Sequence, residues 1–162
     1  MTSGSIDRRT FVGQSAAAGA ALALSGIGFS GETKRVRVGV IGCGSVSNSY
    51  LPHLTKCPHA EVVSLCDIRP ERAEKQAKQF KVTNHYPHID KMLGGVPFDL
   101  LVNLTDMQEH ERLNVAAIDN GKHVWSEKPI ANSLGAGQQL LGWAKQKGVR
   151  LWGAPTDRKS VV

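Results

Sequence analysis

The sequence lacks a concentrated basic stripe with interleaved aromatic residues, which is the usual footprint of a nucleic-acid-binding surface. Aromatic residues make up 6% of the 162 residues, and the formal charge of +6 comes from 20 Lys and Arg against 14 Asp and Glu. The basic residues are dispersed, as in the segments KRVR and KQAKQFK. The charge pattern therefore predicts no nucleic-acid partner.

Cysteine is also scarce. The three cysteines, Cys43, Cys57 and Cys66, are odd in number and have no metal-ligand spacing, so we expect small buried side chains rather than a disulfide framework. The segment NHYPHID (residues 84–90) brings two histidines and an aspartate together, but no cysteine or second cluster supports it. Because a metal site needs a fuller set of ligands, no metal site is predicted.

A glycine-rich turn stands between a predicted strand and a predicted helix. Residues 36–41 form a β-branched run typical of a buried strand, and the segment GCGSVS follows at once. In this G-x-G-x-x-S pattern, Gly42 permits a tight turn and Gly44 lets a pyrophosphate approach the backbone. The start of the next helix, at Ser45 and Val46, offers free N–H groups to phosphates. Alone the motif is weak, because glycine turns are common.

The next strand ends in a carboxylate. The segment EVVSLCDIRPERAEKQAKQF predicts a strand ending at Asp67 and a polar helix beginning near Pro70. At that tip Asp67 can accept hydrogen bonds from both hydroxyls of an adenosine ribose; a simple turn or capping role is the alternative. Arg69 could hold the 2′-phosphate of NADP, but Asp67 would repel that phosphate. We therefore predict NAD as the cofactor, with NADP as the alternative.

Strands and helices continue to alternate in the second half. A strand ends at Thr105, a helix with an apolar stripe ends at Gly121, and a further strand runs into the triplet Glu127-Lys128-Pro129. The pattern predicts an α/β fold with a Rossmann-type doubly wound parallel sheet, whose ligands lie beyond the carboxyl ends of the strands. The predicted strands lie near residues 36–41, 62–66, 100–104, 123–126 and 149–152, with a weak one near 83–86.

Together these segments resemble the glucose–fructose oxidoreductase / inositol dehydrogenase (Gfo/Idh/MocA) family. The matching pieces are VGVIGCGSVS, VSLCDIRPERA, DLLVNLT followed by His110, NGKHVWSEKP and GVRLWGAP, which extend from about residue 35 to residue 155. The resemblance implies an NAD(P)-dependent oxidoreductase that transfers hydride between the nicotinamide and a sugar, cyclitol or related polyol.

The resemblance also implies roles for particular residues. Lys128 matches a lysine at the nicotinamide ribose and the substrate hydroxyl, where it aids proton movement during hydride transfer. Glu127 would fix this lysine and the nicotinamide, and the bond before Pro129 is often cis in relatives. Thr105 would lie near the diphosphate and the nicotinamide ribose. His110 matches a histidine of the family, but packing is an equally ordinary role for it.

One departure from the family pattern affects the nicotinamide pocket. The family usually has Pro-Asn after the threonine, whereas this chain has Asp106-Met107. An acidic side chain therefore replaces a rigid proline next to the implied pocket. By residue type alone, Lys128 itself would be interpreted as a solvated lysine at a strand end.

Residues 1–30 differ in composition from the rest of the chain. Arg8 and Arg9 precede Phe11 and an Ala/Gly/Leu run that is short and glycine-rich for a membrane span. The order is similar to a twin-arginine export signal; a disordered tail or an amphipathic helix is the alternative. We expect a periplasmic or exported protein that folds with its cofactor in the cytoplasm, uses the twin-arginine export machinery, and has its Rossmann domain in residues 31–156.

Family members continue into an α+β second domain, which carries the substrate pocket and often the oligomer interface. We expect that domain to be absent from these residues, and homo-oligomers only for the full-length protein. Residues 157–162, DRKSVV, match no family feature and are expected to be a non-native tail. The fragment alone is expected to be inactive; the alternative function is a non-catalytic nucleotide-binding module. A methyltransferase is disfavoured, because no S-adenosylmethionine motif is found.

Overall fold

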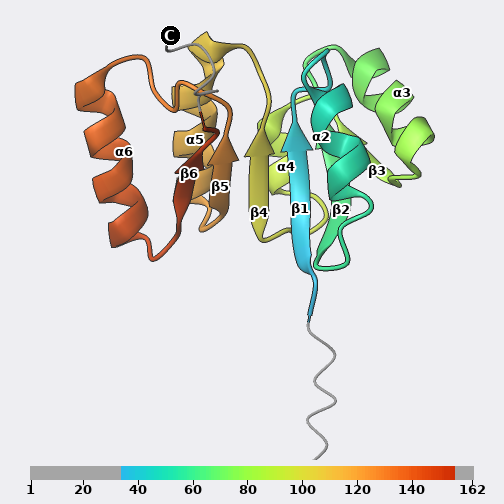
Figure 1. The fold of residues 1–162 in the computed structure, drawn as a ribbon, viewed down its shortest axis with the longest axis horizontal. Helices are drawn as coiled ribbons and strands as arrows, with labels where there is room; N and C mark the ends of the chain where they lie inside the picture. The colour runs from blue at the N-terminus through green and yellow to red at the C-terminus, as the bar shows by residue number, and fades with distance from the viewer. Residues whose placement is uncertain (1–33, 156–162) are drawn as a thin grey trace, which may run out of the picture. The chain divides into compact units, whose positions relative to one another are not determined.

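The computed structural model describes residues 34–155, which form a six-stranded sheet in the order β3-β2-β1-β4-β5-β6 with helices on both faces (Figure 1). The predicted export segment and the predicted tail lie outside the described residues. All neighbouring strands are parallel, which confirms the predicted doubly wound sheet. The strands are β1 (Val36–Ile41), β2 (Ala60–Cys66), β3 (Asn84–Tyr86), β4 (Leu100–Asn103), β5 (His123–Ser126) and β6 (Leu151–Gly153).

The helices begin and end where the local sequence predicts. Pro70 opens its helix, where a missing N–H costs nothing, and Lys81 ends it in a left-handed conformation with φ 58°. Gly121, which follows the helix His110–Asp119, has φ 68°, a left-handed conformation common after a helix. The helices are α2 (Ser47–Leu54), α3 (Pro70–Phe80), α4 (Ile89–Leu93), α5 (His110–Asp119) and α6 (Leu134–Gln146), with a short 3-10 helix at Met107–Glu109.

The core consists of two layers, one on each face of the sheet. Side chains alternate along a strand, so Val38 and Val40 of β1 pack with α2 and α3, whereas Leu101 and Val124 pack with α4, α5 and α6. All four side chains are almost inaccessible to solvent. Burial on both faces explains why these strands read as nearly continuous apolar runs rather than alternating ones.

The strand order reverses between β1 and β4. Chain segments leaving these two neighbours turn in opposite directions, which opens a crevice at the carboxyl ends of the strands. Gly42, directly after β1, has φ 92°, and a Cβ atom there would lie 2.6 Å from the carbonyl oxygen of Leu104. The turn after β1 can therefore approach the turn after β4 only through a residue without a side chain.

No helix within residues 34–155 is long and apolar enough to cross a membrane.

Candidate functional site

A cavity of about 620 Å³ opens at the carboxyl ends of β1, β2 and β4. Its volume lies within the ordinary range for small-molecule sites. Five of the predicted cofactor residues line it, from three separate turns: Gly42, Gly44, Asp67, Arg69 and Thr105. The structure therefore places the residues predicted to contact the diphosphate and the riboses of a dinucleotide around one cavity.

The glycine turn leaves its backbone open toward this cavity. A Cβ atom built at Gly44 would meet nothing closer than Arg72 Nη1, at 3.7 Å. No side chain caps α2 at Val46, and in its first turn the N–H groups of Asn48 and Ser49 donate to the carbonyl oxygens of Ser45 and Val46. Ser45 and Val46 are exposed and do not line the cavity, so their predicted role rests on backbone N–H groups.

Ser47 occupies the third position of the fingerprint, where glycine or alanine is usual. It is fully buried, and its Oγ donates a hydrogen bond to the carbonyl oxygen of Gly44 at 2.6 Å. The hydroxyl therefore satisfies its own hydrogen-bonding need inside the packed turn. Because Ser47 is small, the helix can pack close to the sheet, and its hydroxyl stabilises the glycine turn.

Asp67 links the glycine turn to the start of α3. Its side chain is 7% exposed; Oδ2 accepts from the backbone N–H of Cys43 at 2.8 Å, and Oδ1 accepts from that of Arg69 at 2.8 Å. Each carboxylate oxygen has a second lone pair, which remains available to a ribose hydroxyl. Asp67 therefore has the turn role that the sequence left as an alternative, while its place on the cavity leaves the ribose role a prediction.

Two of the three cysteines lie under this turn. Burial, followed by the nearby charge of Asp67, raises the pKa of Cys43 to about 12. Burial, followed by the charges of Cys43 and Asp67, raises the pKa of Cys66 to about 12. Both thiols are free and buried as predicted, whereas Cys57 is only half-buried.

These differences predict selective thiol labelling. Because the thiolate is the reactive form, Cys43 and Cys66 should stay almost wholly protonated at pH 8 and resist iodoacetamide, while Cys57 reacts. Mass spectrometry of the labelled, folded chain should show one adduct within minutes, mapped to Cys57, and three after denaturation. Equal labelling of all three thiols in the folded chain would contradict the buried placement.

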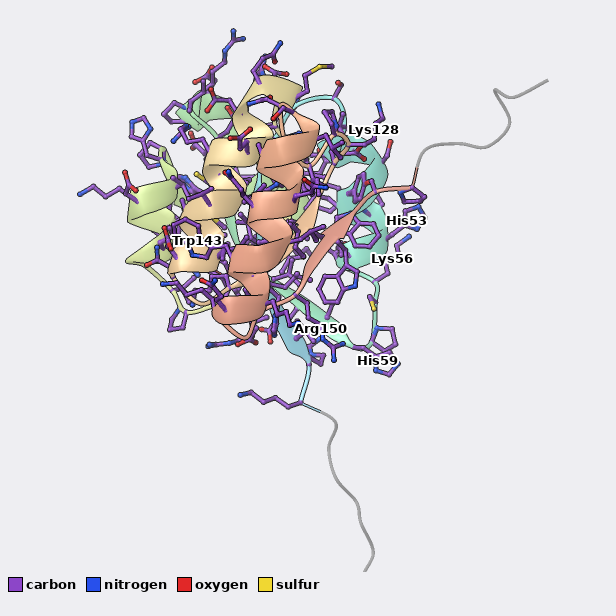
Figure 2. All side chains as sticks on the ribbon, turned by 90° about the vertical axis from the view of Figure 1, so that its left-hand side faces the viewer. His53, Lys56, His59, Lys128, Trp143 and Arg150 are labelled. Atoms are coloured by element: carbon purple, nitrogen blue, oxygen red, sulfur yellow. The ribbon has the colours of Figure 1, made fainter. Side chains whose placement is uncertain are left out.

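Lys128 and Glu127 belong to a second part of the site. Neither residue lines the cavity. Lys128 is exposed at the carboxyl end of the sheet, whereas the labelled residues His59 and Arg150 lie toward the opposite end (Figure 2). The Lys128–Pro129 bond is cis, as the family resemblance implied.

A chain of hydrogen bonds connects the cavity to the turn at residues 127–129, the lysine turn. Thr105 Oγ1 donates to Asn103 Oδ1 at 2.7 Å, and Asn103 Nδ2 donates to Asn114 Oδ1 at 2.9 Å. Asn114 Nδ2 donates in turn to Ser126 Oγ at 3.0 Å, and Ser126 Oγ donates to the carbonyl oxygen of Glu127 at 3.0 Å. The ends of β4 and β5 are thus held together by side chains, in addition to the sheet.

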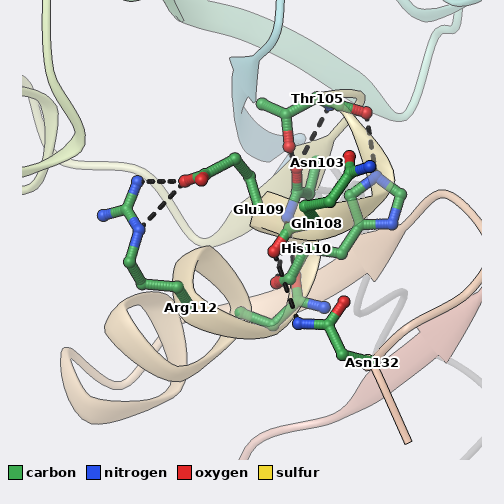
Figure 3. A network of polar contacts seen from close by, with 8 residues as sticks. Asn103, Thr105, Gln108, Glu109, His110, Arg112 and Asn132 are labelled. Atoms are coloured by element: carbon green, nitrogen blue, oxygen red, sulfur yellow. Dashed lines mark hydrogen bonds and ion pairs between the residues drawn. The ribbon is translucent and has the colours of Figure 1, made fainter.

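His110 is buried between the turn at Thr105 and the turn at Pro129. Its side chain is 1% exposed, with Nε2 2.9 Å from the carbonyl oxygen of Thr105 (Figure 3) and Nδ1 2.7 Å from that of Pro129. The ring does not line the cavity. His110 therefore joins the turn at Thr105 to the turn at Pro129 and lies outside the cavity.

The sequence-based prediction missed four residues that build this site: Tyr50, Asn103, Asn114 and Ser126. Asn103 and Ser126 are polar ends of otherwise apolar strands, and Asn114 is fully buried in α5. A polar residue at a position with apolar periodicity is the signal that could have indicated the network. Tyr50 lies in α2, and its phenol reaches Glu127, 77 residues away in the sequence.

The departure at Asp106-Met107 lies beside the cavity. Asp106 lines it, and Met107 begins the short 3-10 helix with its side chain 55% exposed. Within residues 34–155, no three His, Cys, Asp or Glu side chains are grouped as metal ligands would be.

This strand order, with a glycine turn after β1 and a carboxylate after β2, defines a dinucleotide-binding domain of the Rossmann type. Residues 36–154 match the Gfo/Idh/MocA family, described as "Oxidoreductase family, NAD-binding Rossmann fold". The chain belongs to this family and contains its NAD(P)-binding domain.

Individual relatives agree with this assignment. The chain is 34% identical over 110 residues to Glycosyl hydrolase family 109 protein 1 of Phocaeicola vulgatus, covering 61% of this chain and 23% of that protein. It is 30% identical over 118 residues to inositol 2-dehydrogenase of Acidothermus cellulolyticus, covering 72% of this chain and 35% of that protein. The chain therefore spans about a quarter to a third of the length of these relatives.

A solved structure shows the same fold. The WlbA dehydrogenase of Bordetella pertussis, in complex with NADH and UDP-GlcNAcA, superimposes with a TM-score of 0.72 at 26% sequence identity. The match covers 79% of this chain and 39% of the dehydrogenase.

Proposed function

We propose that this chain supplies the NAD-binding half of an oxidoreductase that transfers hydride between the nicotinamide and a hydroxyl of a sugar, cyclitol or related polyol. The observation that carries the proposal is the cavity that unites the open glycine turn with Asp67 and Thr105. The family and the sugar-nucleotide and inositol named for its relatives support this substrate class.

The residues of the cavity fit a dinucleotide. The open backbone at Gly44 and the positive end of the α2 dipole would hold the diphosphate, since both favour a nearby anion. Asp67 would hold the adenosine ribose through its remaining lone pairs. The same carboxylate would repel a 2′-phosphate, which favours NAD over NADP although Arg69 also lines the cavity.

The chemistry of the reaction would divide between the cofactor and Lys128. A bound nicotinamide supplies the hydride acceptor or donor. The Lys128 ammonium would donate a hydrogen bond to the oxygen of the reacting hydroxyl, where negative charge develops as its proton leaves. Glu127 and the buried network would orient the lysine. The substrate class is proposed for the whole protein, since the chain spans about a quarter to a third of the length of these relatives.

Export by the twin-arginine route is part of the proposal. It rests on Arg8, Arg9 and Phe11 and the weakly apolar run after them. A non-catalytic nucleotide-binding module is the second candidate, and the exposed position of Lys128 outside the cavity favours it for this chain alone.

Titration of the 162-residue chain with NAD, NADH and NADP tests the proposal. Calorimetry should show weak binding of NAD and NADH, with a Kd on the order of 0.1–1 mM, and NADP at least about tenfold weaker. No reduction of NAD is expected with myo-inositol or sugar nucleotides. Binding without turnover fits both candidates for this chain; substrate-dependent reduction of NAD would exclude the second candidate, and absence of any nucleotide binding would contradict both.

A further inference from the structure

The phenol of Tyr50 connects α2 to the turn that carries the lysine. Its hydroxyl donates a hydrogen bond to Glu127 Oε1, and the tyrosine is half-buried. The other carboxylate oxygen, Glu127 Oε2, accepts from the backbone N–H of Lys128 at 3.2 Å. One carboxylate therefore joins Tyr50 to the residue with the candidate catalytic ammonium.

The surroundings of the phenol keep it a hydrogen-bond donor. Burial, then the hydrogen bond to Glu127, raises the pKa of Tyr50 above its ordinary value, and the Glu127 charge acts in the same direction. The indole N–H of Trp125 acts in the opposite direction and lowers that pKa in part. Near neutral pH the phenol thus holds its proton and directs it at the carboxylate.

The position of Tyr50 in α2 adds a connection to the cofactor site. Ser47 and Tyr50 lie three residues apart, so they share one face of the helix. Ser47 Oγ holds the carbonyl oxygen of Gly44 in the glycine turn, and the Tyr50 hydroxyl holds Glu127. Figure 2 shows Lys128 beside this helix. A single helix therefore contacts both the phosphate-binding turn and the lysine turn.

We propose that Tyr50 is a positioning residue: its hydroxyl fixes Glu127 and thereby directs Lys128 toward the nicotinamide end of a dinucleotide held by the glycine turn. The identity of the ligand rests on the proposed function, whereas the Tyr50–Glu127 contact is independent of it. Packing alone would need only the ring, which lies against the layer on the α2 face of the sheet. The hydroxyl is therefore the atom to remove.

Tyr50→Phe and Tyr86→Phe form a matched pair of variants of the 162-residue chain. The chain has two tyrosines, and the Tyr86 hydroxyl accepts from the backbone N–H of Val96 at 2.9 Å, away from the lysine turn. Each variant loses one hydrogen-bonded phenol oxygen. Only Tyr50→Phe should affect the lysine turn.

The first measurement is calorimetric binding of NAD and of ADP-ribose, which lacks the nicotinamide. Tyr50→Phe should weaken NAD binding about fivefold, because the lost hydrogen bond orders Glu127 and does not itself contact the ligand, and should leave ADP-ribose binding unchanged. Tyr86→Phe should change neither affinity. An equal loss for both ligands, or no loss for NAD, would overturn the proposed direction toward the nicotinamide.

The second measurement needs no nucleotide. In amide NMR spectra, Tyr50→Phe should shift the Lys128 backbone N–H, because its acceptor carboxylate loses its other partner, while Tyr86→Phe leaves that signal in place. An unmoved Lys128 amide in Tyr50→Phe would overturn the positioning role. If the wild-type chain bound neither nucleotide, the proposed function would fail, and this spectrum would still decide whether Tyr50 orders the lysine turn.

Discussion

Gly42→Ala is expected to lower the free energy of unfolding by roughly 3–4 kcal/mol and to abolish NAD binding. Gly42 has φ 92°, which an alanine adopts only with strain, and the new Cβ would lie 2.6 Å from both the carbonyl carbon and oxygen of Leu104 and 2.7 Å from Thr105 N. These are backbone atoms, so no side-chain rotation relieves the clash. The turn after β4, which lines the same cavity, must move instead.

Gly121→Ala is the matched control for this variant. Gly121 also has positive φ, 68°, but nothing lies within 4 Å of its Cβ position. Only backbone strain remains, so we expect a loss of about 1 kcal/mol and unchanged NAD affinity. Urea unfolding curves and NAD titrations of both variants make the comparison. Equal losses would show that the contact with Leu104 adds nothing to the conformational cost.

Asp67→Ala is expected to weaken NAD binding by about 100-fold or more. The variant removes the charged acceptor to which the ribose hydroxyls would donate hydrogen bonds, each worth roughly 1.5–3 kcal/mol, and also frees the N–H groups of Cys43 and Arg69. Asp67→Asn should be nearly as severe, because one side-chain oxygen becomes a donor facing an N–H. The preference for NAD over NADP should narrow in both variants, since the carboxylate no longer repels the 2′-phosphate.

Asp99→Asn separates the effect on binding from the effect on stability. Asp99 Oδ2 also accepts from a backbone N–H, that of Arg37 at 3.0 Å, but the residue precedes β4 at the amino end of that strand. We expect a modest loss of stability and unchanged NAD affinity, measured by urea unfolding and calorimetry. If Asp99→Asn weakened NAD binding as much as Asp67→Asn, the ribose role of Asp67 would be wrong.

The sequence allowed the sheet and the cavity residues to be predicted because the information there is local. A β-branched run followed by Gly42, or by Asp67, determines its own strand end and turn from neighbouring residues. The strand limits differed by only a few residues; β2, for example, begins at Ala60 rather than at residue 62. The parallel order followed from the alternation of strands and helices.

The polar network could not be predicted in the same way. Asn114 joins a strand end to a turn through partners 11, 12 and 16 residues away, and Tyr50 contacts Glu127 across 77 residues. Such pairs depend on how far each helix rotates and slides on the sheet, which local periodicity does not specify. The role of His110 depends on the same packing, since both carbonyl groups around its ring belong to other turns.

The network of Asn103, Asn114 and Ser126 has a consequence for the cost of cofactor binding. These side chains are fully buried and hydrogen-bonded to one another, so they have few alternative rotamers. Immobilising a rotamer-rich side chain on binding typically costs about 0.5–1.5 kcal/mol. Folding orders this edge of the sheet, so binding of a dinucleotide should cost little further conformational entropy there. The exposed side chain of Lys128 is the main group that binding would still have to immobilise.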